Sequence, residues 1–301
     1  MSQQTESSVA SDTPDFFAED ALREARVAIV GLGLIGGSLA LALKGRCALL
    51  LAADPDPRTR ALAMERGVVD VISPEAAAVV PQADVVVLAA PVRTILHLLD
   101  ELPALHPGRA VVMDVGSTKK EIVDRMATLP ERFDPIGGHP MAGKEKGGLC
   151  HAEATLFRGA VFALTPLSRT SARARRVASA LVAAVGAFPL WLNADTHDQY
   201  AAAISHAPYL LSLALTLATP EEAAVLAGPG FRSTTRLASS PPGVMADILL
   251  TNRAWVLKAL RGFRGQLAAI EAALASGDEA ALRALLAQGP VRREALLAGG
   301  R

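Results

Sequence analysis

The stretch VAIVGLGLIGGSLALAL, residues Val27–Leu43, decides the fold of this chain. Its β-branched start is typical of a buried strand, and its Ala- and Leu-rich continuation is typical of a helix. Between them lies GLGLIG, residues 31–36, a G-x-G-x-x-G pattern directly after a strand and at the start of a helix. In that context the glycines permit a tight turn, close approach of a pyrophosphate and close packing of helix on strand. The stretch predicts a dinucleotide-binding site made by the three glycines and the first helical N–H groups: Gly31, Gly33, Gly36, Leu34 and Ile35.

A second hydrophobic run, Ala48–Ala53, ends at Asp54. This spacing is close to the ~20 residues expected between the glycine pattern and the acid that binds the adenosine ribose. A carboxylate there accepts hydrogen bonds from the ribose and repels a 2′-phosphate, which favours NAD over NADP. Arg58 and Arg60 lie just downstream, where they are positioned to weaken that preference. A glycine-rich turn with an exposed aspartate is the simpler alternative, but the order of strand, glycines, helix and acid favours NAD as the cofactor.

The composition narrows the class of protein. A chain of 301 residues, 51% of them hydrophobic, is long enough for two domains with sizeable cores. Its formal net charge of zero argues against electrostatic binding to nucleic acid or to an anionic membrane. The two cysteines, Cys47 and Cys150, match no disulfide framework and no metal-ligand spacing, so we expect a reducing, cytoplasmic location and no metal. The N-terminal residues lack the basic and apolar regions of a signal peptide.

The apolar segment Ala201–Thr219 is nearly long enough to span a membrane. It contains Ser205, His206 and Pro208, and no Lys or Arg lies close to either end. We therefore expect a fully buried helix at a domain or subunit core instead. On such a helix His206 is expected to be a core histidine whose hydrogen bonds are satisfied.

Three parts are predicted along the chain: a flexible tail over 1–25, a Rossmann domain over 26–192 and a helical substrate and dimerisation domain over 193–301. Strand and helix patterns alternate from Val27 to Leu192, which is typical of a doubly wound parallel sheet. After Asn193 helical segments follow, interrupted by the Gly-, Pro- and Ser-rich segment 228–240. The predicted fold class is α/β, a Rossmann-type parallel sheet followed by an all-α domain.

Ligands of a doubly wound sheet bind beyond the carboxyl ends of its strands. Three segments are expected there: Ala90-Pro91, Gly116-Ser117 and GGHPMAG, residues 137–143. Ser117 or Thr118 is expected to cap the helix that begins at Lys119.

His139, in GGHPMAG, is expected in a stiff loop that a ligand can approach closely. Histidine titrates near neutral pH and is the commonest general base, and an enzyme that removes hydride from an alcohol needs a base for the hydroxyl proton. His139 is predicted to be this base, so that the rate rises as it loses its proton. A loop histidine with a structural hydrogen bond is the alternative.

Five motifs, VGLGLIGGS, AAPVRT, DVGSTK, GGHPMAG and GPGFRSTTR, together resemble the prephenate/arogenate dehydrogenase family of tyrosine biosynthesis. They occur in the family's order, and the resemblance runs from about Val27 to the C-terminal helices. It implies a dinucleotide-binding domain, a helical domain that forms a homodimer, and oxidative decarboxylation of prephenate or arogenate with NAD. No ACT-type regulatory domain is expected after the last helix.

Carried over to this sequence, the resemblance implies that His139 accepts the proton of the substrate's ring hydroxyl. Ser117 is implied to touch the same hydroxyl and to orient the histidine. Arg236 resembles the arginine that binds the ring carboxylate. His197 matches a family histidine near the substrate, and Glu145 matches an acid at the mouth of the pocket.

The chain departs from the family at two places. An acidic-Pro segment with a Trp is replaced by SPPGVM, residues 240–245, where Met245 is expected to line the pocket, and a family histidine is replaced by Tyr209. The preferred substrate therefore stays open: prephenate dehydrogenase is the predicted activity, and arogenate or dual-specificity cyclohexadienyl dehydrogenase is the alternative.

Two other classes are less favoured. A β-hydroxyacid dehydrogenase needs a catalytic lysine in its helical domain, where Lys258 stands without a surrounding motif. An NAD-sensing protein without turnover has no need for His139, Ser117 and Arg236 together.

Overall fold

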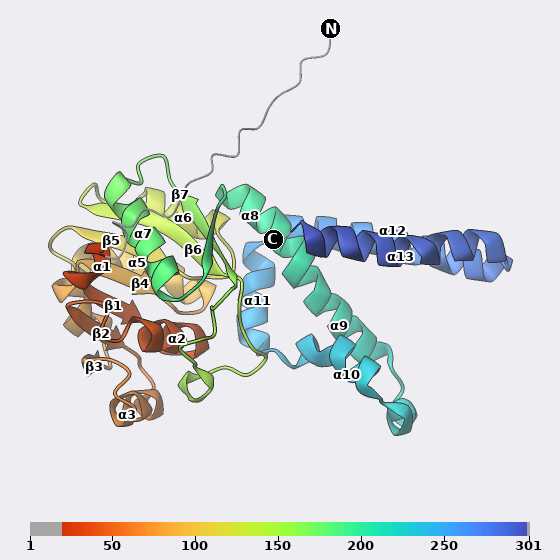
Figure 1. Ribbon diagram of the computed structural model, residues 1–301, viewed down its shortest axis with the longest axis horizontal. Coiled ribbons are helices and arrows are strands. Elements are labelled where there is room, and N and C mark those ends of the chain that lie inside the picture. Colours follow the sequence, from red (N-terminus) through yellow and green to blue (C-terminus); the bar gives the residue numbers. More distant parts are fainter. Residues whose placement is uncertain (1–19, 300–301) are drawn as a thin grey trace, which may run out of the picture.

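The structure, a computed structural model, describes residues 20–299 (Figure 1). Eight strands form one sheet in the order β3-β2-β1-β4-β5-β6-β7-β8. The order reverses between β1 and β4, which is the switch point at which a doubly wound sheet binds its ligand. The strands are β1 (Arg26–Val30), β2 (Leu49–Ala53), β3 (Val71–Ser73), β4 (Val85–Leu88), β5 (Ala110–Asp114), β6 (Phe133–Pro140), β7 (Val161–Pro166) and β8 (Phe188–Trp191).

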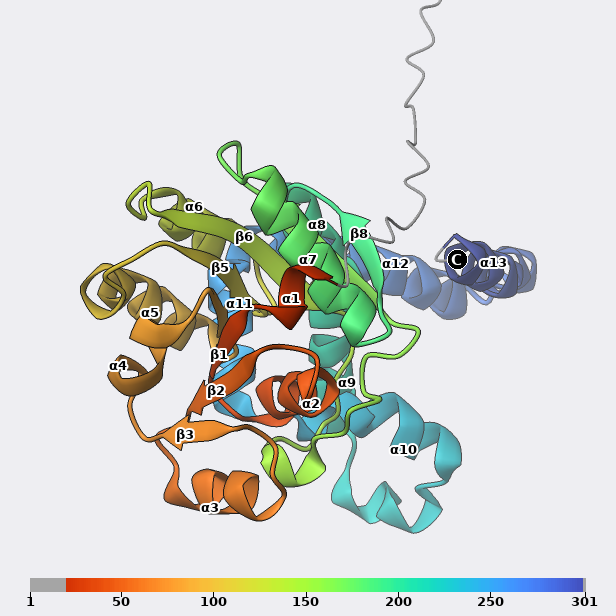
Figure 2. The same cartoon turned by 60° about the vertical axis from the view of Figure 1, so that its left-hand side comes forward.

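Helices cover both faces of this sheet because its central strands are apolar on both sides. In β1, Val27 and Ile29 enter one core, and Ala28 and Val30 enter the other. Figure 2 shows α2 and α7 in front of the sheet and α11 behind it. The first core is covered by α1 (Asp20–Arg23), α2 (Leu34–Leu43), α3 (Pro57–Glu65) and α7 (Ala172–Ala184), the second by α4 (Ala76–Val79), α5 (Val92–Leu105) and α6 (Lys120–Ala127). Two 3-10 turns, η1 (Val80–Gln82) and η2 (Leu149–His151), complete this part.

One pair of strands departs from the predicted parallel sheet. β7 runs antiparallel to β6, with His139 opposite Ala163, whereas the other neighbouring pairs are parallel. His139 therefore lies on a strand, and the prediction of a loop there is wrong. The glycines suit this strand because a Cβ atom on Gly137 would lie 2.1 Å from Thr165 Oγ1.

Helical elements alone follow β8 within the described part of the chain. α8 (Ala194–Ala201), the π-helical turn η3 (Ala202–His206) and α9 (Ala207–Ala218) form one continuous helix. In Figure 1, α9 and the hairpin of α12 and α13 extend away from the sheet as two separate arms, while α11 stands beside the sheet. The remaining elements are η4 (Glu221–Leu226), α10 (Pro229–Thr235), η5 (Arg236–Ser239), α11 (Pro242–Thr251), α12 (Arg253–Ser276) and α13 (Glu279–Ala298).

Two predicted segments need correction. The flexible tail predicted over 1–25 is too long, because Leu22 in α1 is 2% exposed and belongs to the first core. Residues 1–19 lie outside the described residues. The predicted interruption at 228–240 is itself helical, as α10 and η5.

The helix Ala194–Ala218 is, by length and composition only, the one described helix that is long and apolar enough to cross a membrane. Within this single chain it is not fully buried, because Leu215 and Leu217 are 41% and 78% exposed, so burial at a subunit core stays a prediction. Its first half, in contrast, buries His197, Asp198 and His206 against the rest of the chain.

Candidate active site

The carboxyl ends of β1, β4, β5 and β6 lie at one edge of the sheet, because these four strands are parallel. The segments at these ends carry most of the predicted positions. They are Gly31–Gly36 after β1, Ala90-Pro91 after β4, Gly116-Ser117 after β5 and His139 at the end of β6. The fold thus brings the expected cofactor and catalytic groups to the same edge.

The glycine loop has the backbone geometry that a pyrophosphate requires. Gly31 has φ +98°, which glycine adopts without strain, and a Cβ on Gly36 would lie 1.9 Å from the Gly31 carbonyl oxygen. A Cβ on Gly33, at the start of α2, would meet nothing within 4 Å. The backbone is therefore open to a ligand where the helix presents the N–H groups of its first turn, Leu34 and Ile35 included.

Asp54 directly follows β2 and is buried beside the glycine loop. Its carboxylate accepts hydrogen bonds from the backbone N–H of Leu32 at 2.8 Å and of Asp56 at 3.0 Å. Arg60 donates to the Asp54 carbonyl oxygen at 2.9 Å, whereas Arg58 is exposed. Both carboxylate oxygens therefore bond the backbone beside the glycine loop, and ribose binding by Asp54 stays a prediction.

A buried ion pair that no sequence pattern predicted lies at the end of β5. Lys119 Nζ pairs with Asp114 Oδ2, and both side chains are 0% exposed. The Asp114 carboxylate also accepts the N–H of Gly116 at 2.8 Å and of Gly138 at 3.2 Å. Burial raises the pKa of Asp114 and lowers the pKa of Lys119, because each charge loses its hydration. Through the Asp114 carboxylate, the pair holds the backbone after β5 at Gly116 and the backbone of β6 at Gly138.

The His139 side chain meets the helical part of the chain directly. Its Nδ1 lies 2.8 Å from Nε2 of His197 on α8, and His197 Nδ1 lies 2.9 Å from Asp198 Oδ1. His139 is 8% exposed, and His197 and Asp198 are 2% and 1% exposed. Three linked polar side chains therefore run from the end of β6 into α8.

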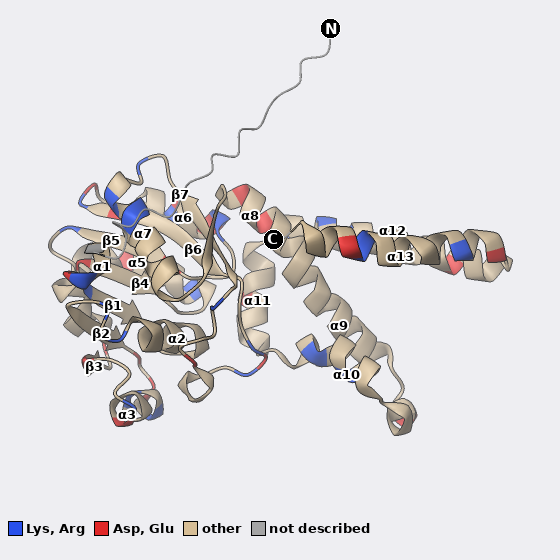
Figure 3. Cartoon of the chain, viewed as in Figure 1, with Lys and Arg blue, Asp and Glu red and all other residues tan. Residues whose placement is uncertain are grey.

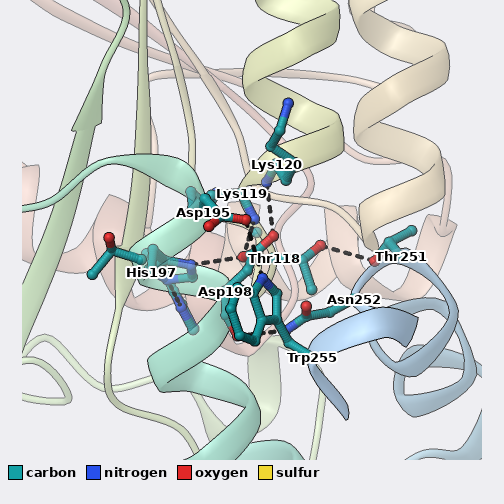
Figure 4. Close-up of polar contacts among 12 residues, drawn as sticks. Thr118, Lys119, Lys120, Asp195, His197, Asp198, Thr251, Asn252 and Trp255 are labelled. Atoms are coloured by element: carbon teal, nitrogen blue, oxygen red, sulfur yellow. Dashed lines mark hydrogen bonds and ion pairs between the residues drawn. The ribbon is translucent and has the colours of Figure 1, made fainter. Parts of the chain in front are cut away.

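Figure 4 shows Asp198 in the middle of polar contacts that join α6, α8 and α12. Its carboxylate accepts the backbone N–H of Lys119 at 2.7 Å and of Lys120 at 2.9 Å, at the start of α6. Asn252 Nδ2 donates to the Asp198 carbonyl oxygen at 2.7 Å. Nearby, Trp255 Nε1 donates to Asp195 at 3.1 Å.

Asp198 supplies the cap that the sequence assigned to Ser117 or Thr118, and that prediction is wrong. No side chain of the cap residue itself bonds the start of α6. The Thr118 hydroxyl instead pairs with the Thr251 hydroxyl at 2.9 Å. An acid at a helix N-terminus also interacts favourably with the helix dipole.

Only one ring nitrogen of His206 has a hydrogen-bond partner among the described residues, in contrast to the prediction of a core histidine whose hydrogen bonds are satisfied. It lies in the π-helical turn η3, and its Nδ1 lies 3.2 Å from Asn252 Nδ2. Its buried Nε2 has no hydrogen-bond partner among the described residues. Burial lowers the pKa of His206 to about 4 despite the nearby Asp198.

His139 is a neutral imidazole at neutral pH. Burial lowers its pKa well below 6.5, because the imidazolium form would lose its hydration, and the nearby Lys119 ammonium acts in the same direction. The neutral form is the one that accepts a proton.

Ser117 and Met245 lie apart from this hydrogen-bond chain. Ser117 follows β5, and its hydroxyl has no hydrogen-bond partner within residues 20–299, so its predicted contact with His139 and substrate stays a prediction. Met245 on α11 is partly buried and packs against the second core of the sheet. Neither position contradicts a contact with substrate.

Arg236 and Glu145 form an ion pair across the two parts of the chain. Arg236 comes from η5 and is 58% exposed at its side chain, whereas Glu145, after β6, is 24% exposed. Two of the predicted substrate-binding residues are therefore neighbours.

The arrangement combines a glycine loop of dinucleotide-binding type, a buried histidine and an exposed arginine paired with Glu145. Hydride removal from an alcohol needs the first two of these. Within residues 20–299 no group of three or more His, Cys, Asp or Glu side chains could hold a metal ion.

Two family models match this chain. The model described as prephenate dehydrogenase, nucleotide-binding domain, matches residues 39–188, and the one described as prephenate dehydrogenase, dimerization domain, matches residues 193–288. Among curated proteins, the prephenate dehydrogenase of Bacillus subtilis (strain 168) is 35% identical over 245 residues. That match covers 77% of this chain and 65% of the relative, so the chain spans about two thirds of that relative's length.

Solved structures agree. A prephenate dehydrogenase from A. aeolicus, in complex with hydroxyphenyl propionate and NAD+, superposes with a TM-score of 0.83 at 29% identity, covering 91% of this chain and 99% of that one. An arogenate dehydrogenase from Synechocystis gives a TM-score of 0.76 at 30% identity, covering 90% of this chain and 99% of that one. Together with the glycine loop, the buried His139 and the helical half, these matches show that the chain belongs to the prephenate dehydrogenase family.

Proposed function

We propose that this chain catalyses the NAD-dependent oxidative decarboxylation of prephenate to 4-hydroxyphenylpyruvate and CO2. The observation that carries the proposal is the buried, neutral His139 at the same sheet edge as the dinucleotide loop. The names of the B. subtilis and A. aeolicus relatives, and the NAD+ bound in the latter, support it. The fit of Gly31, Gly33, Gly36 and Asp54 to a dinucleotide supports NAD as the cofactor.

The chemistry balances with the residues present. When bound, NAD accepts the hydride that leaves the ring carbon bearing the hydroxyl. His139 takes the hydroxyl proton as the carbon–oxygen double bond forms. The carboxylate across the ring then leaves as CO2, because its bonding electrons restore an aromatic ring. His139 returns its proton to the phenolate oxygen, so the base is regenerated.

Turnover assays test the proposal. The full chain is incubated with NAD and either prephenate or arogenate, and NADH is followed by its absorbance. We expect NADH with prephenate, and less with NADP than with NAD because of Asp54. Turnover with arogenate alone would establish the arogenate alternative, which the Synechocystis relative keeps open. NADH formation with neither substrate would refute the proposal and favour a protein that binds NAD without turnover.

Arg236→Ala is expected to raise KM for prephenate roughly 10–100-fold with a smaller change in kcat. A charge-assisted hydrogen bond to a carboxylate contributes roughly 1.5–3 kcal/mol, and this one is made in both ground and transition states. Arg232→Ala is the matched control, because Arg232 is an exposed arginine on the neighbouring helix α10. Equal KM values in the two variants would remove Arg236 from the substrate site.

We further propose that the chain works as a homodimer through its C-terminal helices. The family description of this part as a dimerization domain supports the proposal. Large apolar side chains on both arms are exposed in the single chain, among them Leu217, Leu267, Leu274 and Val291. Such a surface is typical of an interface. A monomeric mass at micromolar concentration would contradict the proposal.

The same proposal includes the division of the chain near residue 192, a cytoplasmic location, and no nucleic-acid or membrane partner. The division is supported by the gap between the two matched family regions, 39–188 and 193–288. The location is supported by Cys47 and Cys150, which are both free. Figure 3 shows basic and acidic residues interspersed along the ribbon, and the formal net charge is zero, which supports the absence of such a partner.

A further inference from the structure

We propose that Asp198 and His197 form a relay that holds His139 in the tautomer whose Nε2 is free to accept the substrate's hydroxyl proton. The inference deepens the proposed function, on whose assignment of His139 as the base it rests. Asp198 is in this view a positioning residue that acts through His197. His197, expected to contact substrate, is assigned a different task.

The first step is the state of the Asp198 carboxylate. It accepts two backbone N–H groups, from Lys119 at 2.7 Å and from Lys120 at 2.9 Å, at the N-terminal end of α6. Backbone N–H groups can only donate, and the positive end of the helix dipole favours an anion there. An ionised carboxylate has no proton to give, so its third partner must donate as well.

The second step is the tautomer of His197. Its Nδ1 is the third partner of Asp198, at 2.9 Å, and therefore carries the proton. When His197 is neutral, its Nε2 is bare, and this atom lies 2.8 Å from His139 Nδ1. Two nitrogen atoms at that distance share one proton, which must come from His139 Nδ1. The proton-free nitrogen of the neutral His139 is consequently Nε2.

The relay also assists the reaction. When Nε2 of His139 takes the proton, the ring becomes an imidazolium whose Nδ1–H still donates to His197. Asp198 on α8 is the anion at the far end of the relay, bonded to His197, whereas Lys119 before α6 opposes a positive charge on His139. His206 in η3 has a pKa of about 4 and is therefore neutral near neutral pH. The carboxylate offsets the charge without itself taking a proton, as the aspartate of a catalytic triad does.

Direct substrate binding by His197 is the competing assignment. Both ring nitrogens of His197 are already engaged, by Asp198 and by His139, and its side chain is 2% exposed. A hydrogen bond from this ring to substrate would require one of those two contacts to break.

Nitrogen NMR on the full chain tests the tautomers without any turnover. With 15N-labelled histidine, long-range 1H–15N correlations distinguish a protonated from a bare ring nitrogen, and His139 is assigned by the signals lost in H139N. We expect Nδ1–H and bare Nε2 for both His139 and His197 at neutral pH. A His139 ring with its proton on Nε2 would overturn the inference.

Matched aspartate variants test the function of the relay. Asp198→Asn places an amide N–H near His197. This favours the opposite tautomer of His197 and, through it, the opposite tautomer of His139. We expect kcat to fall roughly 10²–10⁴-fold, the range of a general base or of a wrong tautomer. Asp195→Asn, the same change three residues earlier at an exposed position of α8, should retain activity. Equal activity of the two variants would refute the relay.

Histidine variants separate positioning from substrate binding and do not disturb the cap of α6. His197→Gln keeps an acceptor for His139 Nδ1, whereas His197→Leu removes it. Under the relay, kcat falls in the leucine variant by roughly 10²-fold and recovers in the glutamine variant, with KM for prephenate unchanged in both. A rise in KM with kcat retained would instead make His197 a substrate ligand. Two combinations refute the relay and leave the proposed function intact. In both the wild type turns over prephenate, while either the two aspartate variants are equally active or the histidine variants raise KM and retain kcat.

Discussion

His139→Asn is expected to lower kcat roughly 10²–10⁴-fold, which is the usual contribution of a general base. Asparagine has a similar size and its amide can still bond His197, but it accepts no proton near neutral pH. The affinity for NAD should stay the same, because the glycine loop and Asp54 do not contact His139 through any hydrogen bond within residues 20–299. Steady-state kinetics and NAD titration measure the two effects separately.

The pH dependence of the wild type follows from the same residue. Burial, with a smaller effect of the Lys119 ammonium, lowers the pKa of His139 well below 6.5, so the proton-accepting form predominates at neutral pH. We expect kcat/KM to be flat around neutrality and to fall only at pH values well below 6.5, as His139 gains a proton. The sequence alone predicts that the rate rises as His139 loses its proton. Burial moves this rise to lower pH. An acid limb centred at 6.5 or above would contradict this assignment.

Two controls keep the result specific. His97→Asn makes the same change at an exposed histidine of α5 and should leave kcat unchanged. Acid unfolding must also be excluded, because His206 has a pKa of about 4 in the folded chain. Its ordinary value is about 6.5, so between these values the unfolded chain binds more protons and stability falls as the pH falls. Circular dichroism at each pH shows whether the chain is still folded where activity is lost.

The family and the fold class predicted from the sequence are confirmed, and local signals explain why. The glycine loop, the strand before it and Asp54 lie within 28 residues of one another along the chain and follow fixed spacing rules, so one sequence suffices to identify them. His139 was singled out by the glycines and proline around it, whereas the resemblance supplied Arg236 and Glu145. The structure brings Arg236 and Glu145 into an ion pair, although they lie far apart in the sequence.

The groups that sequence reasoning missed depend on contacts between distant segments. Asp198 meets Lys119, 79 residues away, and Asn252 meets Asp198, 54 residues away. Hydrophobic periodicity does not predict contacts between such distant residues. One signal could still have been used, because Asp198 directly follows His197 in the sequence. The strand at His139 was missed because glycine and proline have low β-propensity. Pairing with β7 and the close approach of Thr165 to Gly137 decide the local structure there.

Lys119→Met is expected to lower the free energy of unfolding by about 3–5 kcal/mol, the usual cost of leaving one partner of a buried ion pair alone. Lys119 and Asp114 are both 0% exposed at their side chains, so no water can replace the ammonium group. Chemical denaturation at neutral pH measures the loss. Lys120→Met is the matched control: its ammonium pairs with Asp124 at the surface, where a pair contributes about 0–1 kcal/mol.

The double variant Asp114→Asn/Lys119→Met separates charge from packing, because it removes both buried charges at once. We expect it to recover much of the lost stability, since replacing both partners is usually far less costly than removing one. It should not recover full activity, because the Asp114 carboxylate accepts the N–H groups of Gly116 and Gly138 on either side of the catalytic edge. Gly138 directly precedes His139, so a weaker bond there lets the base move relative to His197. Equal stability of the Lys119 and Lys120 single variants would show that the buried pair does not stabilise the fold.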